Sequence, residues 1–395
     1  MKRKINDNLY YIGVNDRQKI LFEGLWPLPF GVSYNSYLLV DNKTVLFDTV
    51  DIHFSEQFIN NLNEALEGKT LDYLVINHME PDHSGSIKIL KKHFPEVQII
   101  GNARTIDMVK GFYNIEENTL CVKDKEELSI GNYTLQFHLT PMVHWPETMM
   151  TYIPEMQTLF SGDAFGTFGT LDGGFTDRQL NTDKYWDEMI RYYSNIVGKY
   201  GSPVQKALEK LANVPISTIC STHGPVWTNP ETIVKVVETY DRLSRYQAED
   251  GVVIAYGSMY GHTASIAEQI GMELANNGVK NIIIHDVSFT DSSYIIRDIF
   301  KYKGLIIGSP TYNNQLFPKV ESLLSQIQAR DIKGRYFSYF GSFTWAGAAV
   351  KRLTSFAESS GFETIGEPIE MKQAQFSSVQ QEINTLAKLM ADKMI

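Results

Sequence analysis

Ile76-Asn77-His78-Met79-Glu80-Pro81-Asp82-His83-Ser84-Gly85 is the most informative run in this chain, and it continues the apolar, strand-like segment Leu74-Val75-Ile76. It places two imidazoles and two carboxylates close together in a sequence with only nine histidines. Many metal sites consist of a rigid strand followed by a loop that turns several side chains toward one point. Imidazole with carboxylate and without thiolate suits iron, manganese or zinc. We interpret the run as half of a two-metal site.

Length, composition and charge limit the classes of protein to be considered. A chain of 395 residues exceeds the size at which a single core stops growing, so two domains are expected. A hydrophobic fraction of 43% is sufficient for packed cores. The formal net charge of -10 and the lack of a long basic run argue against a nucleic-acid partner. Small molecules or proteins are the expected partners.

The cysteine content and the short apolar stretches indicate a cytoplasmic protein. Cys121 and Cys220 are the only cysteines, which excludes a disulfide framework and all-cysteine metal ligation and fits a reducing compartment. The apolar stretch near the N-terminus is too short and interrupted for a signal peptide. No stretch approaches eighteen apolar residues, so no membrane span is expected.

The pattern of predicted elements changes near residue 250. Before it, short strands dominate, with helices between some of them, and this favours a mixed sheet structure with helices on its outer faces. The predicted strands are 36–40, 44–48, 73–76, 97–101, 133–139, 149–153, 158–162 and 218–221, and the predicted helices are 56–66, 184–197, 205–212 and 231–248. We interpret Glu249-Asp250-Gly251 as a linker, which gives domains of 1–250 and 251–395.

After Gly251, apolar runs alternate regularly with amphipathic helices, which is typical of βαβ units and a parallel sheet. The predicted strands are 252–256, 281–285, 304–308 and 336–340, with a fifth near Glu370, and the predicted helices are 264–276, 292–300, 317–328, 347–359 and 378–393. We expect an α/β, doubly wound domain that binds its ligand outside the carboxyl ends of its strands.

Three further ligand types stand where predicted strands of the first domain give way to loops. They are His144, Asp163 and His223, each with Gly or Pro nearby. With the first run they make a set of seven: His78, Glu80, Asp82, His83, His144, Asp163 and His223. Two metal ions about 3.5–4 Å apart need about this many ligands, one carboxylate bridging and positions open for substrate. Asp163 is the expected bridge. A lone histidine at a strand end is usually structural, and we interpret four others so: His53, His93, His138 and His285.

The spacing of these ligands resembles that of the metallo-β-lactamase superfamily, whose pattern is H-x-H-x-D-H followed by His, Asp and His. The resemblance covers the first 250 residues and implies an αββα sandwich. The chain departs from the pattern at Glu80, where the hydrolases carry a second His. A carboxylate is a harder, anionic ligand that favours iron over zinc. Glu80 therefore favours redox chemistry over hydrolysis, and the H-x-E-x-D-H form resembles that of the flavodiiron proteins.

A second motif follows the first strand of the C-terminal domain. Gly257-Ser258-Met259-Tyr260-Gly261-His262-Thr263-Ala264 precedes a predicted helix, where backbone N–H groups and hydroxyls make an anion site. It fits neither a G-x-G-x-x-G dinucleotide turn nor a G-x-x-x-x-G-K-[ST] loop. It resembles the flavodoxin phosphate loop T-x-T-G-x-T, with hydroxyl residues kept at the first and third places. A phosphate is expected against this loop.

Two later loops support binding of the flavin FMN. Each follows a predicted strand and offers amide donors with an aromatic ring, and Tyr312 or Trp345 is expected to stack on the isoalloxazine. The predicted FMN contacts are Ser258, Met259, Tyr260, Gly261, His262, Thr263, Ser309, Pro310, Thr311, Tyr312, Asn313, Asn314, Gly341, Ser342, Phe343, Trp345 and Gly347.

Taken together, the two parts of the chain resemble the flavodiiron proteins over essentially all 395 residues. This family implies reduction of dioxygen to water, or of nitric oxide to nitrous oxide, at a non-haem diiron site fed by FMN. Carried onto this chain, one iron takes His78, Glu80 and His144, and the other takes Asp82, His83 and His223, with Asp163 bridging. His83 is the least secure ligand, because its counterpart lies outside the coordination sphere in some members.

The resemblance also implies partners. A head-to-tail homodimer, alone or within a dimer of dimers, brings the FMN of one subunit beside the irons of the other. The external electron donor is expected to be a rubredoxin, a flavin reductase or reduced deazaflavin, since no rubredoxin-like cysteine pairs follow the C-terminal domain.

Three alternatives stay open at this point. The first is a hydrolase of the metallo-β-lactamase type with an accessory flavodoxin domain, against which Glu80 and the flavin loops argue. The second is an electron carrier whose first domain is only structural. The third is a sensor of oxygen or nitric oxide. The preference between the two gases depends on packing around the open metal positions, to which Trp145 and Phe22-Glu23-Gly24-Leu25-Trp26 are expected to contribute.

Overall fold

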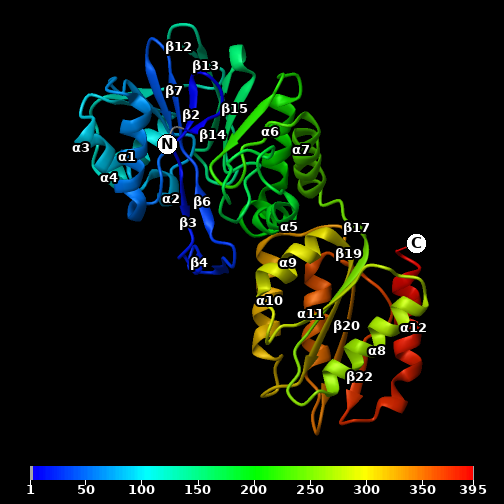
Figure 1. Cartoon of the computed structure of the whole chain (residues 1–395). Helices are drawn as coiled ribbons and strands as arrows, with labels where there is room; N and C mark the ends of the chain where they lie inside the picture. The colour runs from blue at the N-terminus through cyan, green and yellow to red at the C-terminus, as the bar shows by residue number, and fades with distance from the viewer. Residues whose placement is uncertain (1–2, 395) are drawn as a thin grey trace. The chain divides into compact units, whose positions relative to one another are not determined.

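Two units make up the chain in the computed structural model, which describes residues 3–394 (Figure 1). The chain passes from the first unit to the second between Ser244 and Arg245, and residues 194–199 also belong to the second. The division falls a few residues before the predicted boundary. Glu249, Asp250 and Gly251, predicted as a linker, instead begin strand β17, in which Glu249 pairs with Tyr302.

Two sheets form the centre of the first unit. The larger has the order β1-β2-β7-β8-β9-β10-β11, and the smaller has the order β12-β13-β14-β15-β16. The larger contains β1 Arg3–Lys4, β2 Leu9–Tyr11, β7 Tyr37–Val40, β8 Thr44–Phe47, β9 Tyr73–Val75, β10 Gln98–Gly101 and β11 Thr119–Cys121. The smaller contains β12 Glu127–Ser129, β13 Thr134–Leu139, β14 Met149–Ile153, β15 Thr158–Gly162 and β16 Thr218–Ser221.

Helices cover the outer faces of these sheets. Figure 1 shows α1, α3 and α4 beside the larger sheet and α6 and α7 on the side of the smaller one, which is the predicted αββα order. The helices are α1 Ser55–Leu66, α2 Pro81–Ser84, α3 Ile87–His93, α4 Ala103–Tyr113, α5 Asp183–Tyr192, α6 Gly201–Leu211 and α7 Pro230–Ser244. Two small ribbons complete the unit: β3 Val14–Asp16 with β6 Val32–Tyr34, and β4 Leu21–Phe22 with β5 Trp26–Pro27.

The core of the first unit lies between its two sheets. Phe47 of β8 stacks on Phe160 of β15 with ring centroids 3.7 Å apart, and both rings are fully buried. On the outer side, α1 buries Phe58, Ile59 and Leu62, which follow helical spacing. Because side chains from both sheets interlock, the strand ends that carry the candidate ligands are held on rigid elements.

The second unit is a parallel sheet with helices on both faces. The strand order is β18-β17-β19-β20-β21, with β22 also beside β20, and all these pairs are parallel. The strands are β17 Glu249–Tyr256, β18 Ile282–Asp286, β19 Tyr302–Pro310, β20 Tyr336–Phe343, β21 Glu363–Thr364 and β22 Ile369–Lys372. The helices are α8 His262–Asn276, α9 Ser292–Lys301, α10 Pro318–Ala329, α11 Ala349–Ser360 and α12 Gln380–Ala391.

The strand order decides where this unit binds a ligand. The chain runs to one side of β17 to form β18 and then returns to the other side to form β19, so the topological switch point lies at β17. In Figure 1, α8 and α12 lie on one face of the sheet and α9, α10 and α11 on the other. The predicted doubly wound fold is therefore confirmed. None of the helices within residues 3–394 is both long and apolar enough to cross a bilayer.

Candidate metal centre and flavin site

The seven predicted metal ligands come from both sheets of the first unit and converge at the carboxyl ends of its strands. His78 and Glu80 lie in the loop after β9, and Asp82 and His83 lie in the short helix α2, which begins with Pro81. His144, Asp163 and His223 follow β13, β15 and β16 in turn. All seven side chains are buried.

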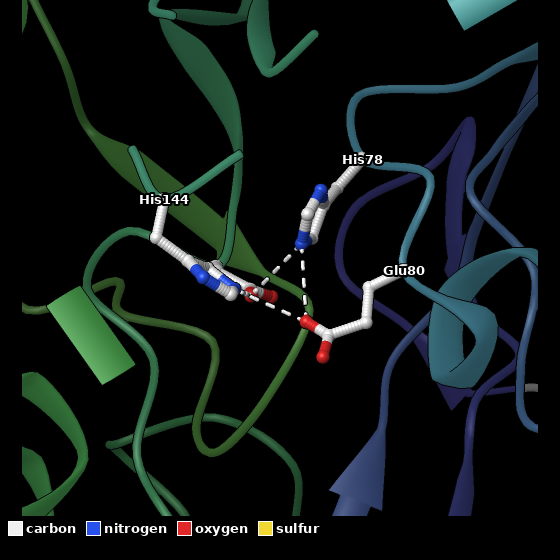
Figure 2. A group of neighbouring side chains, drawn as sticks. His78, Glu80 and His144 are labelled. Atoms are coloured by element: carbon white, nitrogen blue, oxygen red, sulfur yellow. Dashed lines mark hydrogen bonds and ion pairs between the residues drawn. The ribbon is translucent and has the colours of Figure 1, made fainter. Parts of the chain in front are cut away.

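The seven residues form two adjoining groups, each with ligand atoms within 4.8 Å of one another. The first cluster is His78, Glu80 and His144 with Asp163, and the second is Asp82, His83 and His223. Figure 2 shows the rings of His78 and His144 turned toward one oxygen of Glu80. The His78 and His144 Nε2 atoms lie 3.2 and 3.1 Å from Glu80 Oε2. Three donor atoms thus point at one small volume.

Asp163 faces both clusters with different oxygens. Its Oδ2 lies 3.1 Å from His144 Nε2 and 3.4 Å from His78 Nε2. Its Oδ1 lies 3.0 Å from His83 Nε2 and 3.8 Å from His223 Nε2. A carboxylate placed in this way has the geometry of a bridge between two cations.

Outer contacts fix the orientation of two of the histidine rings. His78 Nδ1–H donates to Glu147 Oε1 at 2.8 Å, and His223 Nδ1–H donates to the Ser33 carbonyl at 2.7 Å. Each bond leaves the Nε2 atom free to face the cluster, which is the usual arrangement of a metal-binding histidine. His83 differs, because its buried Nδ1 has no hydrogen-bond partner among residues 3–394.

The unsatisfied groups at the second cluster are those that a cation would satisfy. Both carboxylate oxygens of Asp82 are buried and accept no hydrogen bond in the described part of the chain, although the Nε2 atoms of His83 and His223 lie 3.4 and 3.3 Å from them. The Nε2 atoms of His83 and His223 face each other at 3.0 Å. Buried acceptors without donors are costly, and a shared divalent cation removes that cost. The donor set, all nitrogen and oxygen, fits iron.

The pKa shifts in the cluster support its preference for a cation. Burial lowers the pKa of His144, but its hydrogen bonds to Asp163 and Glu80 outweigh this effect and raise the pKa to about 9. Burial also lowers the pKa of His83, but the Asp82 and Asp163 carboxylates outweigh this effect and raise the pKa to about 9. The three carboxylates therefore attract positive charge even onto the imidazole rings.

Aromatic side chains that are distant in sequence enclose the second cluster. Phe22 meets the His223 ring edge-on with centroids 5.5 Å apart, and Tyr192 lies 5.5 Å from the same ring. The Tyr192 hydroxyl is buried without a hydrogen-bond partner among the described residues. Burial and the nearby carboxylates, Asp163 above all, raise its pKa, so the hydroxyl stays protonated. The sequence predicts that Tyr192 lies in an amphipathic helix but indicates no part for it in the metal site.

Two residues singled out for the metal surroundings also lie there. Trp145 packs edge-on against His78 with centroids 5.4 Å apart. Glu23 is exposed as a residue, but partial burial of its carboxyl together with the nearby Glu80 carboxylate raises the pKa of Glu23 to about 7. The predicted segment 22–26 therefore contacts both clusters, with Phe22 at one and Glu23 at the other.

The phosphate-loop residues line a pocket in the second unit at the switch point. Ser258 Oγ accepts hydrogen bonds from the backbone N–H groups of Gly261 and Ala264, and Gly261 takes a φ of +90° that suits glycine. The pocket is lined by Ser258, Met259, Tyr260, His262, Thr263, Pro310, Thr311, Ser342, Phe343, Thr344 and Gln373. It opens at the N-terminus of α8, where first-turn N–H groups and the helix dipole favour an anion such as a phosphate.

The other predicted FMN contacts do not line this pocket. They are Gly261, Ser309, Tyr312, Asn313, Asn314, Gly341, Trp345 and Gly347. Ser309 is buried, and its Oγ accepts a hydrogen bond from the Phe317 N–H. Trp345 is 87% exposed and Tyr312 is 40% exposed, so both rings are open to a ligand or another chain. Thr344 and Gln373 line the pocket without having been predicted.

Comparison with protein families divides the chain in the same way. Residues 32–224 match the family described as ODP family beta lactamase, and residues 254–385 match the flavodoxin family. Both matches lie where the metal ligands and the phosphate loop were found, and they confirm the predicted α/β fold of each part.

Individual relatives cover nearly the whole chain. The anaerobic nitric oxide reductase flavorubredoxin of Vibrio vulnificus is 34% identical over 366 residues, which is 91% of this chain and 74% of that protein. The solved rubredoxin oxygen:oxidoreductase of Desulfovibrio gigas is 28% identical with a TM-score of 0.95, over 100% of this chain and 98% of that one. The flavodiiron protein of Giardia intestinalis is 25% identical with a TM-score of 0.95, over 100% and 97%.

Proposed function

The chain belongs to the flavodiiron proteins, and from that premise we propose that it reduces dioxygen to water, nitric oxide to nitrous oxide, or both. The reactions are O2 + 4 e− + 4 H+ → 2 H2O and 2 NO + 2 e− + 2 H+ → N2O + H2O. The names of two relatives support both substrates, since one is a nitric oxide reductase and another an oxygen oxidoreductase.

The observation that carries the proposal is the placement of Asp163 between two three-residue clusters. One iron would be held by His78, Glu80 and His144 and the other by Asp82, His83 and His223, with the two oxygens of Asp163 facing the two groups. His83 is the weakest of the seven, because no partner on its Nδ1 fixes the ring. When bound, the two irons and the FMN supply the electrons that either gas requires.

The protein's own residues prepare the pocket for a small apolar gas. Phe22 and Tyr192 exclude bulk water from the side of His223. The Tyr192 hydroxyl keeps its proton because burial and the cluster carboxylates raise its pKa, so it is available as a hydrogen-bond donor beside the metals. Glu23, whose pKa is raised to about 7, is a second proton-bearing group at the Glu80 side.

The FMN site and the partners complete the proposal. The N-terminus of α8 and the Ser258 loop would hold the phosphate, and the exposed rings of Trp345 and Tyr312 would flank the isoalloxazine. The flavorubredoxin and rubredoxin oxidoreductase relatives support a rubredoxin-type electron donor. The exposed Trp345 supports a head-to-tail homodimer, because the second chain of such a dimer would cover this ring.

Metal and flavin analysis tests the proposal. Purified protein should contain two irons and one FMN per chain and should consume one or both gases when reduced anaerobically. Two zinc ions per chain without flavin absorbance would instead indicate a hydrolase. Rapid consumption identifies an enzyme, whereas gas binding without turnover would indicate a sensor. Loss of gas reduction in His144→Ala with FMN retained excludes a simple electron carrier.

A further inference from the structure

Glu147 is a buried carboxylate that stands behind the first cluster and is not one of the seven proposed ligands. It is 0% exposed, and its Oε1 accepts hydrogen bonds from His78 Nδ1 at 2.8 Å and from the Met79 backbone N–H at 2.9 Å. Its Oε2 is buried with no hydrogen-bond partner among residues 3–394. A buried carboxylate with an unsatisfied oxygen destabilises a fold, so packing does not account for it.

The carboxylate is also held rigidly in place. The Asn102 side chain donates from Nδ2 to the Glu147 carbonyl at 2.5 Å, and the same side chain caps α4 by accepting from the Arg104 and Thr105 N–H groups. Glu147 is thus anchored to a helix on its backbone side and to the 78–79 loop on its carboxylate side. The carboxylate cannot turn away from His78 without breaking its bonds to the His78 ring and the Met79 N–H.

Three of the four histidines in the two clusters differ in their outer partners. His78 donates to an anion, His223 donates to the neutral carbonyl of Ser33, and His83 Nδ1 has no partner in the described chain. A carboxylate behind a histidine fixes its tautomer and makes the imidazole a stronger donor to a metal than a carbonyl does. A buried negative charge also favours the more oxidised, more positive state of a nearby ion.

We propose that Glu147 is a positioning residue that makes the two metal ions unequal. It locks His78 with Nε2 toward the first cluster, and its charge makes the iron held by His78, Glu80 and His144 the more tightly bound and the more easily oxidised of the pair. This inference rests on the proposed function, because it assigns a difference within the diiron site proposed above.

The test compares iron release and iron oxidation in the holoprotein. Glu147→Gln keeps a hydrogen-bond acceptor for His78 but removes the charge, and Asp177→Asn is the matched control. Asp177 is a buried carboxylate of the same unit that accepts hydrogen bonds from the backbone N–H groups of Thr228 and Asn229. Each variant is challenged with an excess of a ferrous chelator under anaerobic conditions, and release of the two irons is followed separately.

We expect Glu147→Gln to release one iron about 10–100-fold faster than the wild type, with the second iron unchanged. In an anaerobic redox titration followed by electron paramagnetic resonance, the first oxidation should move to a higher potential. Glu147→Asp, which keeps the charge, should release the iron more slowly than Glu147→Gln. Asp177→Asn should match the wild type in both measurements.

The inference is overturned if Glu147→Gln leaves both release rates and the first potential unchanged, or if it accelerates both irons equally. It is also overturned if Glu147→Asp releases iron as fast as Glu147→Gln. Failure of the proposed function looks different, because the wild-type protein would then lack iron before any chelator is added. Retained FMN in each variant shows that the second unit is still folded.

Discussion

Replacing Asp163 with Asn removes the one charge that the two clusters share while keeping the shape of the side chain. Both Asp163 oxygens face imidazoles of different clusters, and Thr222 Oγ1 donates to Oδ1 at 2.5 Å. Removing one partner of a buried charged pair typically costs about 3–5 kcal/mol. Since 1.4 kcal/mol is a factor of ten in binding, each iron is expected to bind on the order of 10²–10⁴-fold more weakly.

The assay is iron content after equilibration with a chelator of known affinity, with FMN measured in the same sample. Asp163→Asn should lose both irons and keep FMN, because the flavin pocket lies wholly in the second unit. Asp177→Asn, which removes a buried carboxylate outside both clusters, should keep both irons. If Asp163→Asn retains one iron with wild-type affinity, Asp163 does not bridge, and the two-cluster assignment is wrong.

Three other substitutions test the fold and the flavin site. Phe160→Ala removes the ring that stacks on Phe47 and should lower the free energy of unfolding by about 3–5 kcal/mol, measured by urea denaturation of the metal-bound protein. Burial raises the pKa of Asp298, but hydrogen bonds from His285 and Arg297 outweigh this effect and hold it below its usual range. The ionised Asp298 carboxylate stabilises the folded protein at pH values above its unfolded-state pKa. This stabilisation is lost as the pH falls through the folded-state pKa of Asp298. The stability difference between wild type and Asp298→Asn should therefore shrink on acidification, and a constant difference would contradict the assignment. Gly261→Ala forces a side chain into φ +90° at the phosphate loop and should weaken FMN binding in a fluorescence titration, whereas an unchanged dissociation constant would show that the loop does not hold the phosphate.

Local sequence patterns predicted the elements that carry the ligands. Strands β14, β15 and β16 begin and end where their apolar runs do, because each run is short, buried on both faces and bounded by turn residues. The predicted helix 184–197 was less accurate. Regular α-helix ends at Tyr192, and Tyr193–Val197 forms a π-helical turn that propensity does not distinguish from α-helix.

The surroundings of the ligands were mostly beyond prediction. Glu147 lies 69 positions from His78, and Tyr192 approaches His223 from helix α5. These pairs meet only when the two sheets pack, and no local periodicity records them. Asp163 was predicted as the bridge because it stands alone between two lone histidines in the sequence, and its two oxygens lie toward different clusters.

The most direct test of the account is anaerobic turnover of the reduced protein with each gas in turn, for the wild type and for His144→Ala. His144 Nε2 lies 3.1 Å from both Glu80 and Asp163, so its loss removes a proposed ligand of the first iron without touching the flavin pocket. The account predicts that the wild type consumes dioxygen, nitric oxide or both, and that His144→Ala consumes neither while its FMN is still reduced by the donor. Undiminished gas consumption by His144→Ala would contradict reduction at the paired metal site.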